Sequence, residues 1–164
     1  MAKITFKNGD EYMVKLNRLA KNLREEVIGP AVYEGGKIIT DGIAERLPDI
    51  KTDEAWAGES GKKKGPKEVE LRAVYNGLGI APMRNDNGFI NVKVGFGGYS
   101  DIKTKRWPNG QPIPMLARSI ERGTSFMTAQ PFVKPTVAAL TKKTVEVMGE
   151  TVDGEIKKIM ERTK

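Results

Sequence analysis

The spacing of apolar residues predicts two helices in the N-terminal third of the chain. Over residues 10–28, large apolar side chains recur every three or four positions, which places them on one stripe of a helix. Gly29-Pro30 is predicted to end this helix, because proline lacks the N–H that a helix interior needs. A second helix is expected over residues 31–46. Its buried stripe is expected to comprise Val32, Ile39 and Ile43.

A further apolar stripe predicts a long helix at the C-terminal end of the chain. Pro135 suits the first turn of this helix, where its missing N–H is not needed, and the pattern continues to Arg162. A helix of that length extends about 42 Å, given the rise per residue of an α-helix. Its buried face is expected to comprise Val137, Leu140, Thr144, Met148, Val152, Ile156 and Ile159.

Short elements separated by turns are predicted in the middle of the chain. A short helix is expected over residues 68–76, followed by an edge strand. The sequence Asn-Asp-Asn-Gly at 85–88 predicts a tight turn into a half-buried strand over residues 89–96, where apolar and polar side chains alternate. Another short helix is expected over residues 115–121. These patterns predict an α+β fold, in which two N-terminal helices and a long C-terminal helix pack on a small, mostly antiparallel sheet.

Two long segments have no usable periodicity. Residues 49–67 and 97–114 are rich in Lys and Gly, and we interpret both as irregular loops within a single domain of residues 1–164. Neither segment carries the apolar residues that would let it bury itself. We therefore expect a monomer or weak oligomer in dilute solution, with residues 51–66 and 98–112 protected from hydrogen exchange only after assembly.

Composition narrows the chemistry that the chain can perform. Its 164 residues suit one domain, and it contains no Cys and no His. Their absence excludes a disulfide framework, a thiolate nucleophile, and the commonest general base and metal ligand. We expect no enzyme activity, no cofactor and no metal. The formal net charge of +7 favours anionic partners, and no apolar run approaches the ~20 residues of a membrane span.

Basic residues, a tryptophan and prolines lie close together in the second loop and the short helix after it. Prolines make such a loop semi-rigid, and Trp and Arg are enriched at binding hot spots. One interpretation is a contact with a neighbouring subunit. The alternatives are a small basic nucleic-acid-binding module, in which cations neutralise phosphates while a tryptophan stacks on a base, or a solvated loop whose tryptophan folds back on its own sheet. The candidate interface residues are Lys103, Lys105, Arg106, Trp107, Pro108, Arg118 and Arg122.

A more specific pattern lies between residues 102 and 132. A basic, proline-containing insertion is followed by A-x-x-x-E-x-G-T-S and, shortly after, by Q-P-F. Together with the order of the elements around it, this pattern resembles the head–tail joining family of long-tailed bacteriophages. Members of that family are neck or minor tail components, related to the minor tail protein Z of phage lambda. The residues that carry the motif are Ala117, Glu121, Gly123, Thr124, Ser125, Gln130, Pro131 and Phe132.

The resemblance implies a structural virion protein that joins or completes the head–tail connection. Such a protein acts at the neck or upper tail as a homo-oligomeric ring, for which six subunits is the family-level expectation. Its implied partners are adjacent neck, connector or tail-terminator proteins, with non-specific contact to packaged DNA and no membrane. Its implied location is the virion and, during assembly, the host cytoplasm. Gly123 is expected to end the short helix sharply, and Phe132 to enter the core.

Overall fold

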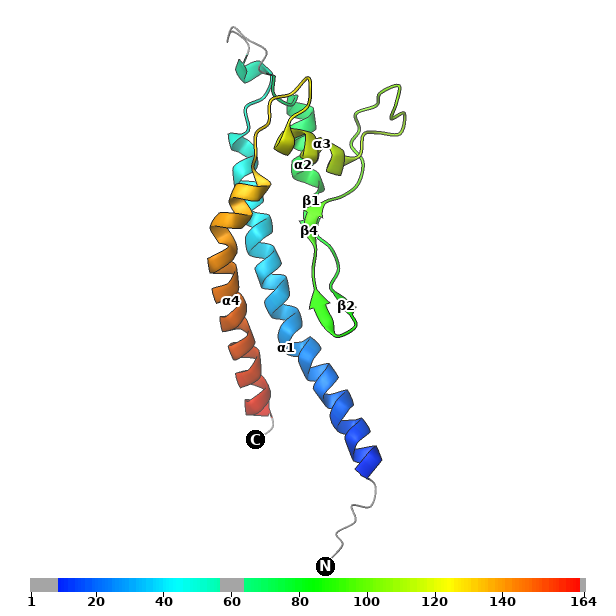
Figure 1. Cartoon of the computed structure of the whole chain (residues 1–164), viewed down its shortest axis with the longest axis vertical. Helices are drawn as coiled ribbons and strands as arrows, with labels where there is room; N and C mark the ends of the chain where they lie inside the picture. The colour runs from blue at the N-terminus through cyan, green and yellow to red at the C-terminus, as the bar shows by residue number, and fades with distance from the viewer. Residues whose placement is uncertain (1–8, 57–63, 163–164) are drawn as a thin grey trace, which may run out of the picture.

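The structure, a computed structural model, describes residues 9–56 and 64–162. Two long helices, α1 (Gly9–Arg46) and α4 (Val133–Arg162), lie side by side and antiparallel along the long axis of the molecule (Figure 1). The other helices gather at the end where α1 finishes and α4 begins, and we call this part the head (Figure 1). The head comprises the 3-10 helices η1 (Leu47–Asp49) and η2 (Glu54–Trp56), the α-helices α2 (Glu68–Gly77) and α3 (Ile113–Arg122), and their connections.

The two N-terminal helices predicted from the sequence form one continuous helix, α1, and the break predicted at Gly29-Pro30 is wrong. A proline inside a helix removes a hydrogen bond and costs about 3 kcal/mol. Close packing around it offsets this cost: Ala31 is 1% exposed, and a Cβ on Gly29 would lie 2.9 Å from the Met83 sulfur. Tertiary contacts thus keep the helix continuous. The predicted stripe is buried at Ile43 and half-buried at Val32 and Ile39.

Glycines on α1 allow its neighbours to approach closely. A Cβ on Gly35 would lie 2.7 Å from the sulfur of Met148 in α4, and a Cβ on Gly42 would overlap the side chain of Leu140. Gly36 faces the strands instead, where a Cβ would lie 3.0 Å from a valine methyl group. Close packing against α4 and the strand region therefore explains the Gly35-Gly36 pair.

Four short strands form two antiparallel pairs along one extended hairpin. The inner pair lies next to the head, and the outer pair continues beside α1 away from the head (Figure 1). This arrangement confirms the small antiparallel sheet predicted from the sequence. The inner pair is β1 (Leu78–Ile80) with β4 (Val94–Phe96), and the outer pair is β2 (Arg84–Asp86) with β3 (Phe89–Asn91).

The hairpin has the predicted turn but not the predicted single strand over residues 89–96. Asn87 and Gly88 take φ angles of 55° and 92°, which a tight hairpin turn requires, so the predicted turn is confirmed. The strand is interrupted because Pro82 cannot donate to the ladder. One extra residue between β1 and β2 also shifts the register, which is the geometry of a β-bulge.

The hydrophobic core lies where the head meets the ends of α1 and α4. Val74 of α2 is fully buried, and Ile120 of α3 is 1% exposed. Phe132 is 2% exposed and packs edge-on against Phe96 of β4, with the ring centroids 5.9 Å apart. Its predicted core position and the α+β fold class are both confirmed. The buried cluster comprises Ile43, Leu47, Ile50, Val74, Ile113, Leu116, Ala117, Ile120 and Phe132.

The predicted buried face of α4 is correct only in part. Val137 and Ile156 are 40% and 44% exposed, so neither belongs to it. Thr136, which has no apolar signature, is 2% exposed, and its buried hydroxyl is satisfied because it donates to the Phe132 carbonyl at 2.6 Å. The other predicted members are half-buried: Leu140, Thr144, Met148, Val152 and Ile159.

Candidate functional site

The motif that carries the family resemblance builds the junction between α3 and α4. The Glu121 carboxylate accepts the backbone N–H of Phe132 at 2.7 Å and that of Val133 at 2.9 Å. It accepts a third hydrogen bond, of 3.0 Å, from the N–H of Lys134. These groups begin α4, where N–H donors have no partner within the helix. The next residue, Pro135, has no N–H, so one carboxylate satisfies every unpaired donor at this helix end.

Two opposing effects act on the pKa of the Glu121 carboxyl. Burial would raise the pKa, because it removes water from the charged form. The hydrogen bonds from Val133, Phe132 and Lys134, together with the Lys134 ammonium, outweigh burial and lower the pKa from its ordinary value. Glu121 is therefore charged at neutral pH and complements the positive end of the α4 dipole.

The segment between α3 and α4 is a tight turn that exposes an aromatic ring. Gly123 ends α3 with a φ of 74°, a conformation that favours glycine, which confirms its predicted role. The N–H of Thr124 donates to the Met127 carbonyl at 2.8 Å, and the Thr124 hydroxyl accepts the N–H of Phe126 at 3.1 Å. The Phe126 side chain is 83% exposed. We call residues 124–127 the Phe126 turn.

Gln130 ties this junction to the first long loop. Its Oε1 accepts the backbone N–H of Lys51 and its Nε2 donates to the Lys51 carbonyl, each at 2.8 Å. At the far end of the same loop, the N–H of Thr128 donates to the Lys64 carbonyl at 2.9 Å. The described parts of the loop, on either side of residues 57–63, are therefore hydrogen-bonded within one chain. The prediction that residues 51–66 are protected from hydrogen exchange only after assembly stays a prediction.

Most of the motif residues stabilise the fold through hydrogen bonds, backbone conformation or core packing. Glu121 and Gln130 bond to backbone groups, and Ala117 is 3% exposed in the core. Ser125 and Pro131 are exposed. The six residues with structural roles are Ala117, Glu121, Gly123, Thr124, Gln130 and Phe132.

The second long loop projects from the head and is held by its own hydrogen bonds (Figure 1). The N–H of Ser100 donates to the Gln111 carbonyl at 2.9 Å, and the N–H of Gln111 donates to the Ile102 carbonyl at 3.0 Å. Further along, Thr104 and Trp107 exchange backbone hydrogen bonds of 3.1 and 3.0 Å, which close a tight turn. These hydrogen bonds give residues 98–112 a defined backbone path, and their protection from hydrogen exchange only after assembly stays a prediction. We call residues 97–112 the projecting loop.

Arg106 and Trp107 lie together in the projecting loop. The guanidinium carbon of Arg106 lies 5.7 Å from the centroid of the Trp107 ring, within cation–π range. Trp107 is half-buried and lines a hollow of about 430 Å³ with Tyr99, Pro108, Asn109 and Gly110, all from the same loop. The tryptophan thus faces a hollow formed by residues of its own loop. The exposed candidate residues of this loop are Lys103, Lys105, Arg106 and Pro108.

Arg118 and Arg122 lie apart from this group, on the exposed face of α3. They line a second hollow, of about 460 Å³, beside the start of α4. Lys134 adds a third cation there, and Phe96 and Val133 supply apolar wall. No ion pair forms between any of these three cations and a carboxylate within the described part of the chain. The two hollows share no lining residue, so the seven candidates fall into a loop group and an α3 group.

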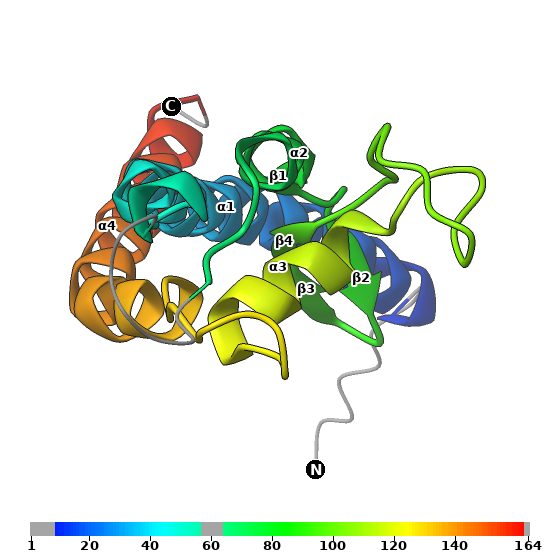
Figure 2. The same cartoon turned by 90° about the horizontal axis from the view of Figure 1, so that it is seen from above.

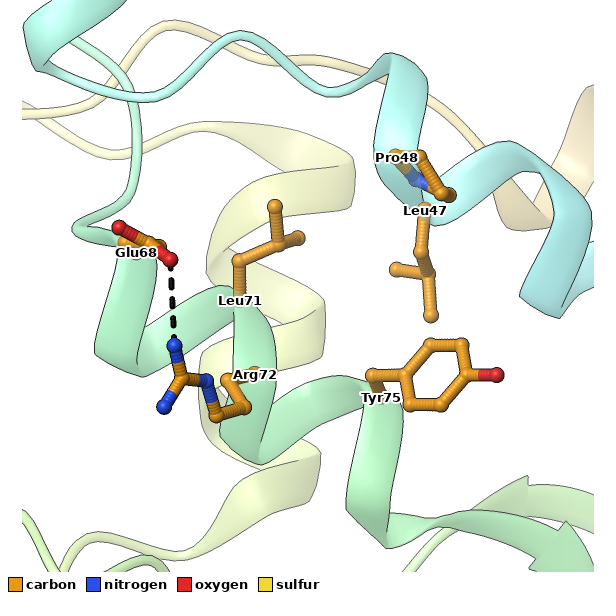
Figure 3. A pocket seen from close by; sticks show the side chains of 6 residues that line it. All are labelled: Leu47, Pro48, Glu68, Leu71, Arg72 and Tyr75. Carbon is orange, nitrogen blue, oxygen red and sulfur yellow. Dashed lines mark hydrogen bonds and ion pairs between the residues drawn. The ribbon is translucent and has the colours of Figure 1, made fainter.

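A shallow apolar groove between η1 and α2 has no counterpart in the sequence predictions. Its volume is about 200 Å³. Figure 3 shows Leu47 pointing toward the ring of Tyr75, with Leu71 directed into the gap between the two elements. Glu68 and Arg72 form an ion pair of 3.2 Å on its rim. Periodicity could not indicate this groove, because the 49–67 loop separates its two walls in sequence. We call it the η1–α2 groove.

Two further findings concern the helices and the acidic side chains of the described part of the chain. No helix there is long and apolar enough to cross a bilayer. Residues 9–56 and 64–162 also contain no group of three or more Asp, Glu, Cys or His side chains placed to hold a metal ion. Comparisons of the chain with protein-family models, curated proteins and solved structures give no match. Function is therefore inferred from the geometry and from the motif.

Proposed function

We propose that this protein is a structural subunit of the neck or upper tail of a long-tailed phage. It joins the DNA-filled head to the tail as one member of a homo-oligomeric ring. It is a building block rather than an enzyme, and its working surfaces are those that contact neighbouring proteins. The motif between residues 102 and 132 supports the family, and the shape of the chain supports the role.

The main support for this proposal is the large accessible surface of a single chain. The accessible surface is 12341 Å². A compact monomer of 18.1 kDa exposes about 8,000 Å². The 17 residues outside the described part cannot account for the whole excess, because even an extended chain exposes only about 160 Å² per residue. An elongated chain with this much surface suits a subunit that its neighbours cover.

Large apolar side chains at the extremities of the molecule support the same role. Phe89 in the outer strand pair is 78% exposed, and Tyr99 in the projecting loop is 69% exposed. Met160, near the end of α4, is 65% exposed. Single exposed apolar residues are common, but these lie on widely separated parts of an elongated chain (Figure 1). They suit a ring subunit that has neighbours on two sides and partner proteins above and below.

Within this proposal, the projecting loop contacts an acidic face of a neighbouring subunit or of an adjacent neck protein. Its internal hydrogen bonds and prolines lower the entropy lost on docking. Arg106 and Trp107 are of the residue types that dominate binding hot spots, where truncation costs about 2 kcal/mol or more. The exposed Lys103 and Lys105 add positive charge beside them.

Gene deletion with complementation tests the proposal. A phage that lacks this protein is expected to produce filled heads and separate tails, and the wild-type chain is expected to restore joining. An Arg106→Ala/Trp107→Ala variant is expected to keep its melting temperature and fail to restore joining. Lys37→Ala/Tyr33→Ala removes a cation and an aromatic ring that are both exposed on α1, and it serves as the matched control.

Two outcomes of this experiment contradict different parts of the proposal. Normal particles from the deletion strain would contradict the function itself. Normal joining by Arg106→Ala/Trp107→Ala would contradict the role of the projecting loop. Salt-dependent DNA binding that is lost on removing Lys103 and Lys105 would instead favour the nucleic-acid-binding alternative.

A further inference from the structure

One face of the inner strand pair carries almost no side chains. Successive side chains of a strand point to opposite faces. Gly79 of β1 lies directly opposite Gly95 of β4, and Gly97 lies two residues further along on the same face. A Cβ on any of these three glycines would have no neighbour from another part of the chain within 4 Å. Ala81 and Lys93 occupy the same face at the end away from the head. We call these five residues the glycine platform.

No contact within the described part of the chain explains the three glycines. Glycine weakens a strand, because it loses more conformational freedom than other residues and has no side chain to pack. None of Gly79, Gly95 and Gly97 has a positive φ, none lies against an atom that a Cβ would displace, and the inner pair has no bulge. The remaining general reason for glycine in a strand is close approach by a ligand or by another backbone.

The glycine platform is an open hollow of about 320 Å³ beside an unpaired strand edge. The strands and α4 lie on opposite sides of α1, so α4 does not cover the platform (Figures 1 and 2). The N–H of Ala81 donates to the Lys93 carbonyl at 2.8 Å. Because bonded and non-bonded pairs alternate along an antiparallel ladder, the backbone groups of Val94 and Phe96 point away from β1. Within the described residues, these groups have no hydrogen-bond partner.

Residues 3–7, Lys-Ile-Thr-Phe-Lys, have the sequence of a strand that fits this edge. They precede α1 and lie outside the described part of the chain. In an extended segment, Ile4 and Phe6 share one face and the polar side chains share the other. An aromatic side chain on a neighbouring strand compensates for a glycine at a sheet edge by covering it. The segment therefore offers the side chain that the platform lacks.

This segment cannot reach the platform of its own chain. The strand pair lies beside Gly36, where a Cβ would be 3.5 Å from a methyl carbon of Val94. Gly9 begins α1 and lies about 40 Å from Gly36 along the helix, at the rise per residue of an α-helix. Residues 3–8 span at most about 22 Å when fully extended. An occupant of this sequence must come from another copy.

We propose that residues 3–7 of one copy add to β4 of the next copy as a third strand, with Phe6 over the glycine platform. This inference rests on the proposed ring, because a heterologous contact of this kind closes into a ring when the rotation between copies divides a full turn. Backbone hydrogen bonds supply affinity, and the apolar side chains over the platform supply specificity. Lys3 and Lys7 project from the other face of the added strand, away from Lys93.

One substitution separates the contact from the fold. Gly95→Val places a strand-forming residue in open space, so it is expected to retain or raise the melting temperature. The same valine would occupy the position of Phe6 from the next copy and is expected to block the contact. Gly149→Ala also fills open space at a glycine, on α4, and it serves as the matched control that leaves the contact intact.

Cysteine crosslinking measures the contact, because the chain has no cysteine of its own. Lys7→Cys places a thiol next to Phe6 and retains the ring, while Lys93→Cys places one on the platform. We mix these two full-length variants at concentrations up to about 1 mM, where weak contacts form, and add a short bis-maleimide linker. The mixed pair is expected to crosslink roughly tenfold or more above Lys7→Cys mixed with Lys143→Cys, an exposed control on α4.

Further variants make the outcome decisive. Gly95→Val added to Lys93→Cys, or Phe6→Ala added to Lys7→Cys, is expected to reduce the crosslink to the control level, whereas Gly149→Ala is not. Equal yields for the platform and control thiols would overturn the inference. An undiminished crosslink with Gly95→Val and Phe6→Ala would also overturn it, as would an internally linked monomer as the main product of Lys7→Cys/Lys93→Cys. Those results would leave the deletion phenotype untouched, so failure of this contact and failure of the proposed function are distinguishable.

Discussion

The side chain of Gln130 bonds both backbone groups of Lys51, 79 residues away in sequence, much as a neighbouring strand would. This pair fixes the start of the 49–67 loop against the junction between α3 and α4. Glu121 caps α4 at the same junction. Two polar residues thus hold the start of the 49–67 loop and the start of α4 at this junction, beside the hydrophobic core.

Removing the Gln130 amide is expected to release the loop at Lys51. Gln130→Ala loses both hydrogen bonds and is expected to lower the free energy of unfolding by about 1–2 kcal/mol. Gln130→Glu keeps an acceptor for the Lys51 N–H but sets a carboxylate against its carbonyl. Hydrogen exchange at the Lys51 amide is expected to accelerate in the alanine variant and less in the glutamate variant. An unchanged Lys51 amide in Gln130→Ala would show that the loop is held by other contacts.

The Glu121 cap is expected to make stability depend on pH. Its pKa is lowered in the folded chain, so its stabilisation is fully present above the unfolded value of about 4.3 and is lost as the pH falls through the folded value. Glu121→Gln is expected to lower the free energy of unfolding by about 1 kcal/mol at pH 7. The difference in unfolding free energy between wild type and Glu121→Gln is expected to narrow below pH ~4, because the Glu121 carboxylate becomes protonated. Thermal unfolding of both proteins across this pH range measures the difference in stability.

A matched control separates the cap from a general loss of charge. Glu150 is exposed on α4, and Glu150→Gln is expected to leave the melting temperature almost unchanged at each pH. The difference in stability between wild type and Glu121→Gln could instead stay constant from pH 7 to acidic pH. That result would mean that the carboxylate charge is not the stabilising feature.

Two aspartate substitutions on α4 distinguish its packed face from its exposed one. Leu140 is half-buried against Gly42 of α1, so Leu140→Asp places a charge in a tight helix contact and is expected to cost several kcal/mol, roughly 2–5. Ile156 is 44% exposed, and Ile156→Asp is expected to cost less than about 1 kcal/mol. Denaturant unfolding of both variants measures the difference, and equal losses would place Ile156 in the packed face after all.

Glycine substitutions test whether the projecting loop is a fixed structure. Gly110 has a φ of 107°, and a Cβ there would overlap the Ser100 carbonyl oxygen, so Gly110→Ala is expected to cost about 1–3 kcal/mol and to expose the Ser100 amide to exchange. Gly149 lies inside α4 with open space around it, and Gly149→Ala is expected to stabilise the chain by about 0.5–1 kcal/mol. A Gly110→Ala variant as stable as wild type would mean that the loop changes shape freely.

Apolar periodicity was sufficient to predict the long C-terminal helix, and turn-forming residues were sufficient to predict the tight turn at Asn87-Gly88. It failed at Gly29-Pro30, because local propensity predicts a break there while packing against Met83 keeps α1 continuous. It also missed Thr136, a polar residue that packs against Gly42 while its hydroxyl is satisfied by the Phe132 carbonyl. These errors share one cause, which is that tertiary contacts are not encoded in the spacing of residues along one segment.

The candidate site shows the same limit. The sequence placed Arg106 beside Trp107, and the structure finds them in contact. It could not separate the loop cations from Arg118 and Arg122, because their surroundings come from β4 and α4. The η1–α2 groove could not be predicted either, because its two walls come from segments that the 49–67 loop separates in sequence. Of the residues that sequence reasoning missed, only Phe126 left a signal, as an aromatic residue in a polar turn between two helices.

Electron cryomicroscopy of particles from cells that carry this gene tests the central claim most directly. The account predicts a ring of density between the head and the tail, built from copies of an elongated protomer whose paired long helices match α1 and α4. It also predicts that the ring is missing from the unjoined heads and tails of the deletion strain. Particles that contain no copy of this chain, or that carry it throughout the head shell or along the tail tube, would contradict it.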